Sequence, residues 1–327
     1  MRVLILGGTV FLGRHLVDAA LDRGDQVTLF HRGRHPAHRA ADVTEIHGDR
    51  ASALDLLTGR HFEAVVDTCG YLPRDVRKSA TLLSADHYTF ISSASVYAPT
   101  TVVPLTEDSE LVEPPDPAVT DTAGELYGPQ KVGCERALSD VRDALVLRAG
   151  LIVGPHDPTD RFTYWATRMR RPGPVLAPDV SDQLVQFIDA RDLARWVMGA
   201  AAGGVSGAMN VNGPRRRMTF GSFLRAPGDA SVRWVAEDVL LAAGVQPWSE
   251  LPLWLPERFG VPGMMDLDVS RAERAGLTTR PVAETLRDTA EWGERNPIRV
   301  RADYGTRARS TVLTAERETA LLHVLGG

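Results

Sequence analysis

Short, nearly all-apolar runs alternate with amphipathic stretches through the first 150 residues. A run of Val, Ile and Leu without polar alternation predicts a strand buried on both faces, which is typical of parallel sheets. We predict six such strands, at residues 2–6, 26–30, 43–47, 63–67, 87–92 and 144–148. Helical patterns lie between most of them, at residues 11–23, 51–58, 73–84 and 125–139. The alternation predicts an α/β fold with a doubly wound parallel sheet of the Rossmann type.

The pattern is looser beyond residue 150, where Trp is confined to residues 165–292. Further helices are predicted at residues 160–170, 190–201, 236–243, 282–294 and 314–324. We predict a dinucleotide-binding domain over residues 1–150, to which residues 180–212 return, and a smaller irregular substrate-binding lobe over residues 151–327 with the C-terminal helices. Residues 296–312 carry Arg299, Arg301, Arg307 and Arg309 and are predicted to form an exposed arm before the last helix.

Composition and charge narrow the function classes. The 327 residues contain 37 Lys and Arg against 42 Asp and Glu, giving a net charge of −5, so we expect no general attraction for nucleic acid. No apolar run is long enough to cross a membrane, and we expect no membrane partner. The two cysteines, Cys69 and Cys134, form no disulfide framework, which favours a reducing, cytoplasmic location.

The segment GGTVFLG, residues 7–13, separates the first predicted strand from the first predicted helix. A glycine-rich turn between a strand and a helix presents backbone N–H groups and a helix N-terminus to a pyrophosphate. Gly7 would form the tight turn and Gly13 would allow close packing, but the middle glycine of a G-x-x-G-x-x-G pattern is Val10. Val10 fits only with a negative φ. The alternative is an ordinary strand–turn–helix without a ligand.

The second predicted strand ends in HRGRHP, residues 31–36, without the acidic residue that an NAD-preferring site uses on the ribose. Arg32 and Arg34 stand there instead, and a guanidinium binds a 2′-phosphate and stacks on adenine. We therefore expect NADP as cofactor, with NAD less favoured; a solvated basic loop is the alternative. Asp49 is a candidate acceptor for the adenine amino group, or a simple turn residue.

Tyr127 and Lys131 in YGPQK are four residues apart, on one face of a predicted helix. A Lys ammonium beside a phenol favours the phenolate, which makes Tyr an acid/base group closer to neutral pH. Ser93 ends the preceding strand in FISSASVY, where its hydroxyl can donate to a substrate oxygen. Taken singly, each feature also has an ordinary interpretation. Tyr127 and Lys131 would be a surface pair, and Ser93 would be a strand-end serine bonded to backbone.

Together these segments resemble the extended short-chain dehydrogenase/reductases, the NAD-dependent epimerase/dehydratase family. The resemblance rests on GGTVFLG, FISSASVY and YGPQK, with LRAGLIVGP at 147–155, QFIDARDLA at 186–194 and RPVAETLRDTAEW at 280–292. A branch of this family that includes chloroplast stem-loop-binding proteins resembles GGTxFLG, so Val10 is a branch marker. The resemblance implies a catalytic set in which Tyr127 exchanges the proton, Lys131 holds the nicotinamide ribose and Ser93 binds the substrate oxygen.

The resemblance also implies the contact residues. DTCGY at 67–71 lies where the family passes the cofactor. The expected cofactor contacts are Gly7, Thr9, Val10, Phe11, Leu12, Gly13, Arg32, Arg34, Asp49, Arg50, Thr68, Cys69, Gly70 and Lys131. A homodimer is also implied, through a helix bundle that includes the Tyr–Lys helix.

Two departures from the family bear on the substrate. Where nucleotide-sugar relatives place an Asn on the sugar or phosphate and an Arg on the diphosphate, this chain has Leu151 and Val185. Losing both polar anchors argues against a nucleotide-diphosphate substrate. Aromatic residues near 156–165 and 246–257 would roof an apolar cleft, or else form the core of the lobe. The expected substrate contacts are Tyr71, Ser95, Asp157, Arg161, Tyr164, Trp165, Gln186 and Trp248.

We expect no metal, because His31, His35 and His38 lie in an Arg-rich loop without cysteines or paired acids. The leading hypothesis is an NADP-dependent oxidoreductase that moves hydride to or from a carbonyl or alcohol carbon of a small, non-nucleotide metabolite. The alternatives are a nucleotide-sugar epimerase or dehydratase with tightly held NAD, and a non-catalytic cofactor-sensing or RNA-binding protein.

Overall fold

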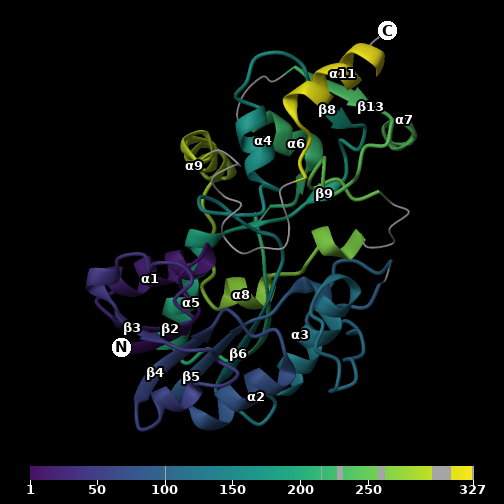
Figure 1. The fold of residues 1–327 in the computed structure, drawn as a ribbon. Helices are drawn as coiled ribbons and strands as arrows, with labels where there is room; N and C mark the ends of the chain where they lie inside the picture. The colour runs from purple at the N-terminus through teal and green to yellow at the C-terminus, as the bar shows by residue number, and fades with distance from the viewer. Residues whose placement is uncertain (100, 215, 227–230, 257–261, 297–310, 326–327) are drawn as a thin grey trace.

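The computed structural model describes residues 1–99, 101–214, 216–226, 231–256, 262–296 and 311–325 (Figure 1). Seven parallel strands form the main sheet, in the order β3-β2-β1-β4-β5-β6-β11. They are β1 (Arg2–Leu6), β2 (Gln26–His31), β3 (Thr44–His47), β4 (His61–Asp67), β5 (Ser84–Ile91), β6 (Ala144–Ala149) and β11 (Gly207–Val211). The doubly wound Rossmann fold predicted from the sequence is confirmed. The chain order reverses between β1 and β4, the place where such folds bind ligands.

Helices cover both faces of this sheet. Helices α1 (Leu12–Asp22) and α5 (Ala190–Ala202) pack together on one face, over Val3 and Ile5. Helices α2 (Pro73–Leu82) and α3 (Tyr127–Arg136) pack on the other, over Leu4 and Leu6. Alternate β1 residues thus enter opposite cores, which is why its four buried residues, 3–6, are all apolar. We call the sheet and these helices the sheet domain; strand β11 and α5 lie within the segment 180–212 that was expected to return to it.

The remaining elements form a second body beyond the carboxyl ends of the strands, which we call the C-terminal lobe (Figure 1). Its small strand pairs are β8 with β13 and β9 with β12, and β7 pairs with β10 where the chain crosses between the two bodies. Its strands are β7 (Ile152–Val153), β8 (Val175–Pro178), β9 (Leu184–Val185), β10 (Ile188–Asp189), β12 (Met218–Thr219) and β13 (Val232–Val235). Its helices are α4 (Thr163–Arg168), α6 (Phe220–Arg225), α7 (Glu237–Ala242), α9 (Val282–Arg295) and α11 (Ala315–Leu325), with α8 (Ser270–Arg274) nearer the sheet.

One predicted helix is shorter in the structure than the sequence suggested. The helix predicted at 51–58 is only a 3-10 turn, η2 (Leu54–Leu57), because Ser52 and Ala53 donate to the Asp49 carbonyl in a preceding turn. Of the predicted arginine arm, residues 297–310 lie outside the described residues. No helix in the described part of the chain is long and apolar enough to cross a membrane.

Candidate active site

The GGTVFLG segment forms a tight loop between β1 and α1. Gly7 has a φ of 98°, and a Cβ there would lie 2.5 Å from the Thr68 hydroxyl, so only glycine fits. A Cβ at Gly13 would lie 2.5 Å from the Gly8 Cα, so Gly13 allows the helix to start against the loop. The positive φ among the non-glycine loop residues is at Phe11, at 39°, and not at Val10. The condition under which Val10 is compatible with a phosphate loop is therefore met.

The parallel sheet collects the other expected cofactor contacts at the same edge, because all its strands end there. The Thr68 hydroxyl donates to the Leu6 carbonyl at 2.8 Å and joins the end of β4 to the loop. Gly70 is buried beside Cys69. Thr9 and Leu12 are buried within the loop and contribute backbone and packing rather than exposed side chains.

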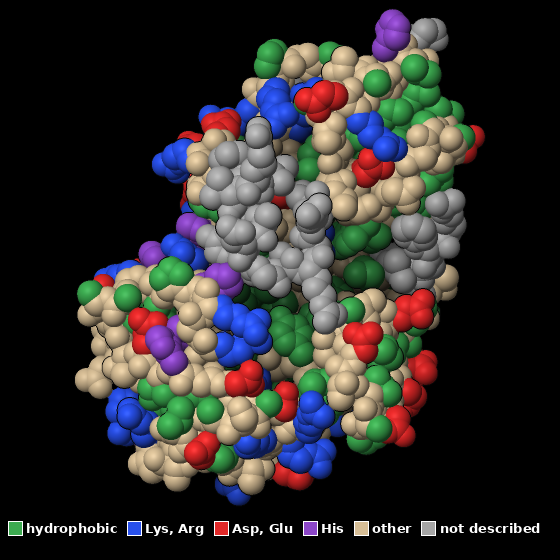
Figure 2. All heavy atoms as spheres, in the orientation of Figure 1, with side chains coloured by type: hydrophobic (Ala, Val, Ile, Leu, Met, Phe, Trp, Pro, Cys, Tyr) green, Lys and Arg blue, Asp and Glu red, His purple; other side chains and the backbone are tan. Residues whose placement is uncertain are grey.

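Arg32 and Arg34 are exposed at the end of β2 and form no ion pair with the described residues. Figure 2 shows Lys, Arg and His side chains gathered on the part of the sheet domain nearest the C-terminal lobe. The Asp49 carboxylate accepts a hydrogen bond from the Ala51 N–H at 2.9 Å, as a turn residue does. The two guanidinium groups therefore remain available to an anion.

Arg50 is placed differently from what the sequence suggested. Its guanidinium forms a two-pronged ion pair with Asp67, at 2.7 and 2.8 Å, and also donates to the Ser79 hydroxyl at 2.8 Å. The Arg50 charge holds the pKa of the fully buried Asp67 carboxyl below its usual range, although burial alone would raise it. The Arg50 guanidinium is thus taken up by Asp67 and Ser79 and holds the end of β4 in place, instead of contacting the cofactor as the sequence predicted.

Lys131 lies in the second turn of α3 and is buried, with a relative exposure of 3%. Its ammonium donates to the carbonyl oxygens of Gly70 and Ile91, each at 2.9 Å, at the ends of β4 and β5. Among the described residues these are its hydrogen-bond acceptors, so the third N–H of the ammonium is left for a ligand. The Lys131 Nζ lies 5.9 Å from the centre of the Tyr127 ring and 5.0 Å from that of Tyr71. The ammonium thus lies close to both phenol rings.

Tyr127 is the first residue of α3, and the turn after β5 lies against this end of the helix. A Cβ on Gly128 would lie 2.1 Å from the Ser95 carbonyl oxygen, so the backbones are in direct contact. In that turn the Ser93 hydroxyl accepts from the Ser95 N–H and donates to the Ser95 hydroxyl, both at 3.1 Å. The Tyr127 hydroxyl has no hydrogen-bond partner among the described residues. The structure thus brings Ser93, Ser95, Tyr127 and Lys131 to one place.

The expected substrate contacts in the C-terminal lobe are placed mainly in its core. Trp165 is fully buried and its indole N–H donates to the Pro252 carbonyl at 2.7 Å. Tyr164 lines a cavity between α4 and α11 with Arg168 and Glu318. Gln186 is buried and hydrogen-bonded to the backbone of Leu267. The core interpretation of the aromatic residues therefore fits Trp165, and the polar contact expected at Gln186 is instead used within the protein.

Two further expected contacts, Asp157 and Arg161, lie in the loop before α4, and a third, Trp248, lies against Arg161. The Asp157 carboxylate accepts from Thr159, whose hydroxyl accepts from the Arg161 guanidinium at 3.2 Å. The same guanidinium lies 5.4 Å from the Trp248 ring centre. Tyr71, by contrast, is 48% exposed above Lys131. Tyr71 and Ser95 are thus the expected substrate contacts that lie beside the candidate catalytic residues.

The histidines that are close in the sequence lie in different surroundings in the structure. His38 contacts Asp18 and Arg14 on α1, whereas His31 lies beside Glu45 and His47. The missed signal was the strand register, because His31 and His47 end neighbouring parallel strands at paired positions.

Comparison with known proteins identifies the family of the chain. The model of the NAD dependent epimerase/dehydratase family matches residues 3–211. The chain belongs to this family. The resemblance predicted from the sequence motifs is confirmed, and family membership supports an enzyme of the extended short-chain dehydrogenase/reductase type.

Individual proteins similar to this chain carry different names. The 41 kDa chloroplast stem-loop binding protein b of Arabidopsis thaliana is 27% identical over 59% of this chain and 53% of its own. A UDP-glucose 4-epimerase of Azospirillum brasilense is 32% identical over 49% of this chain and 51% of its own. The chain therefore matches about half the length of each. The NAD⁺ complex of WbmH from Bordetella bronchiseptica has a TM-score of 0.64 at 16% identity, covering 90% of this chain and 98% of that one.

Proposed function

We propose that this member of the epimerase/dehydratase family is an NADP-preferring oxidoreductase acting on a carbonyl or alcohol of a small metabolite that is not a nucleotide sugar. The observation that carries the proposal is the arrangement of Lys131 beneath Tyr127, with the Ser93 turn held against the same helix end by Gly128. A bound nicotinamide would supply or accept the hydride. The Gly7–Gly13 loop would hold the pyrophosphate of the cofactor. The remaining N–H of the Lys131 ammonium would donate to the nicotinamide ribose.

The chain's own residues supply the proton chemistry. Ser93 donates a hydrogen bond to the substrate oxygen and orients it towards Tyr127. Tyr127 gives its hydroxyl proton to that oxygen during reduction and removes it during oxidation. The Lys131 ammonium lies 5.9 Å from the centre of the Tyr127 ring, so its positive charge is near the group that exchanges the proton. Burial of Lys131 excludes competing water from this contact.

The two missing polar anchors support a substrate other than a nucleotide sugar. Leu151 and Val185 have relative exposures of 8% and 0% and lie in the same apolar core of the C-terminal lobe. A diphosphate brought to these positions would face hydrocarbon, which strongly disfavours a charged group. The free guanidinium groups of Arg32 and Arg34 support NADP, since no acidic residue follows β2 to receive ribose hydroxyls.

The test is a fluorescence titration of the purified protein with NADPH and with NADH. We expect NADPH to bind at least about tenfold more tightly, and replacing Arg32 and Arg34 by Ala to remove about 1.5–3 kcal/mol of binding free energy for NADPH. NADH affinity should change little. Arg39→Ala is the matched control, because Arg39 lies on the same loop but pairs with Asp42 at 2.9 Å. Tighter binding of NADH would contradict the cofactor assignment.

A nucleotide-sugar epimerase that recycles NAD is the second candidate, favoured by the 32% identical UDP-glucose 4-epimerase. Such an enzyme would retain NAD through purification. Denaturing the purified protein and finding stoichiometric NAD in the supernatant would favour this candidate over the reductase. Finding none would count against it.

A further inference from the structure

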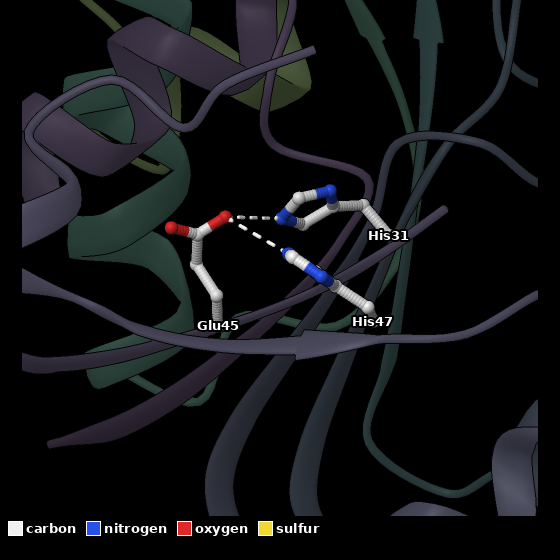
Figure 3. A group of neighbouring side chains, drawn as sticks. All are labelled: His31, Glu45 and His47. Atoms are coloured by element: carbon white, nitrogen blue, oxygen red, sulfur yellow. Dashed lines mark hydrogen bonds and ion pairs between the residues drawn. The ribbon is translucent and has the colours of Figure 1, made fainter. Parts of the chain in front are cut away.

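Two histidines and a carboxylate meet beside the exposed arginines at the end of β2 (Figure 3). The Glu45 Oε2 lies 2.9 Å from His31 Nε2 and 3.3 Å from His47 Nε2. His31 is buried, with a relative exposure of 7%, whereas the His47 side chain is exposed. The family chemistry described above does not use this cluster.

One backbone contact determines the state of the His31 ring. The Gly33 N–H points at His31 Nδ1, with an N···N distance of 3.1 Å. Nδ1 must therefore carry a lone pair, and the ring proton of neutral imidazole is on Nε2. That N–H donates to Glu45, so both ring nitrogens have a partner. The contacts select one neutral tautomer of His31.

The same tautomer argues against a metal ion, although the three ligand atoms lie within 4.8 Å of one another. A metal would need the lone pair of His31 Nε2, which would place the ring proton on Nδ1. Two N–H groups, of His31 and Gly33, would then face each other. The geometry of the cluster therefore fits a hydrogen bond to the backbone of Gly33 rather than metal binding.

We propose that His31 is a positioning residue for cofactor choice: its Nδ1 holds the Arg32-Gly33-Arg34 turn in the conformation that presents both guanidinium groups to a 2′-phosphate. The inference rests on the proposed preference for NADP. The anchored N–H belongs to the residue between the two arginines, so its hydrogen bond restricts the backbone on both sides. Glu45 acts through His31 by accepting the Nε2 proton.

Protonation of His31 would break the anchor, because Nδ1 would lose its lone pair. Burial, the largest effect, lowers the His31 pKa from 6.5; the Glu45 carboxylate opposes this and His47 adds to it. With a lowered folded-state pKa, the anchor is intact above pH 6.5 and is lost as the pH falls through the folded value. The groups facing the ring are Glu45, His47 and the Gly33 N–H.

The experiment compares NADPH and NADH affinities of the full chain for three variants. His31→Phe removes the acceptor and should weaken NADPH binding by about 3–10-fold while changing NADH binding less than about twofold. His31→Asn places an acceptor near the Nδ1 position and should keep most of the NADPH preference. His47→Gln is the control and should behave as the unmodified protein. Thermal melting verifies that each variant is folded.

The pH dependence adds a readout that a merely structural role would not give. The 2′-phosphate itself titrates near pH 6, so NADPH binding weakens in acid for any such site. The Asn variant retains that effect but has no residue 31 proton to bind. We expect the NADPH:NADH affinity ratio of the unmodified protein to fall more steeply below about pH 6.5 than that of His31→Asn. Equal slopes would overturn the inference.

The remaining outcomes are distinguishable. If the unmodified protein prefers NADPH and His31→Phe keeps the full preference, the inference fails and the proposed function stands. If the unmodified protein shows no preference for NADPH, the proposed cofactor fails and the inference fails with it. Nitrogen NMR of the unmodified protein should show the Nε2–H tautomer; the Nδ1–H form would overturn the inference. So would micromolar zinc binding that both His31→Asn and His47→Gln abolish.

Discussion

The sheet domain and the C-terminal lobe place their distinctive side chains in different environments. In the sheet domain, the turn after β5 and the start of α3 bring Ser93, Tyr127 and Lys131 to one edge, and the Tyr127 hydroxyl has no hydrogen-bond partner in the described part of the chain. In the lobe, Trp165 and Gln186 are buried and bonded to backbone. The reaction type can therefore be inferred from the topology of the first body. A substrate bound by the C-terminal lobe would not contact Trp165, which is fully buried.

The largest effect should come from Tyr127→Phe. Removing the hydroxyl removes the proton donor while the ring still packs near Lys131, so turnover should fall about 10²–10⁴-fold. NADPH affinity should stay within about twofold, because Lys131 and the glycine loop are untouched. Steady-state rates over a panel of carbonyl compounds, with parallel cofactor titration, give both numbers. Turnover by the Tyr127→Phe variant equal to that of the unmodified protein would refute the assignment of the sheet-domain chemistry.

Trp165→Ala tests whether the buried aromatic core of the C-terminal lobe serves stability rather than substrate binding. Truncating a fully buried Trp should lower the free energy of unfolding by about 3–5 kcal/mol, which urea denaturation measures. Trp248→Ala should have a smaller effect, because Trp248 is only partly buried and contacts the Arg161 guanidinium. If Trp165→Ala instead left stability unchanged and altered only substrate turnover, Trp165 would be a substrate contact after all.

The smallest predicted effect is a loss of stability at acidic pH, which arises from two histidines between the sheet domain and the C-terminal lobe. His15 on α1 contacts the Pro155 carbonyl at 2.9 Å, and the His156 ring lies 5.9 Å from that of His15. Burial lowers the pKa of both histidines, that of His156 to about 4. Between pH 6.5 and 4 the unfolded chain binds more protons, so stability should fall as the pH drops.

Melting temperature against pH measures this effect. Because His156 is partly exposed and screened by solvent, we expect its share to be below about 1 kcal/mol. His156→Asn should flatten the decline between neutral pH and pH 4, leaving the parts due to His15 and His31. A decline of unchanged slope in the variant would show that His156 does not titrate in this way.

Most of the sheet domain could be predicted because its strands are apolar on both faces and its loop needs glycine at defined positions. Helix α4 and the Tyr127–Lys131 spacing were also predicted in place, although α4 is shorter than expected. The role of Arg50 could not be predicted, since its partner Asp67 is brought to it only by the packing of β4 beside β1. The burial of Trp165 likewise depends on how distant segments of the lobe meet.

Gly128 has a consequence for the mutational robustness of this protein. The position tolerates no side chain, because the Ser95 carbonyl occupies the space a Cβ would need. Any substitution would push the start of α3 away from the serine turn, while the glycine loop lies between β1 and α1. We expect Gly128→Ala to lower turnover more than it lowers cofactor affinity, so an assay of abundance or binding alone would understate the damage.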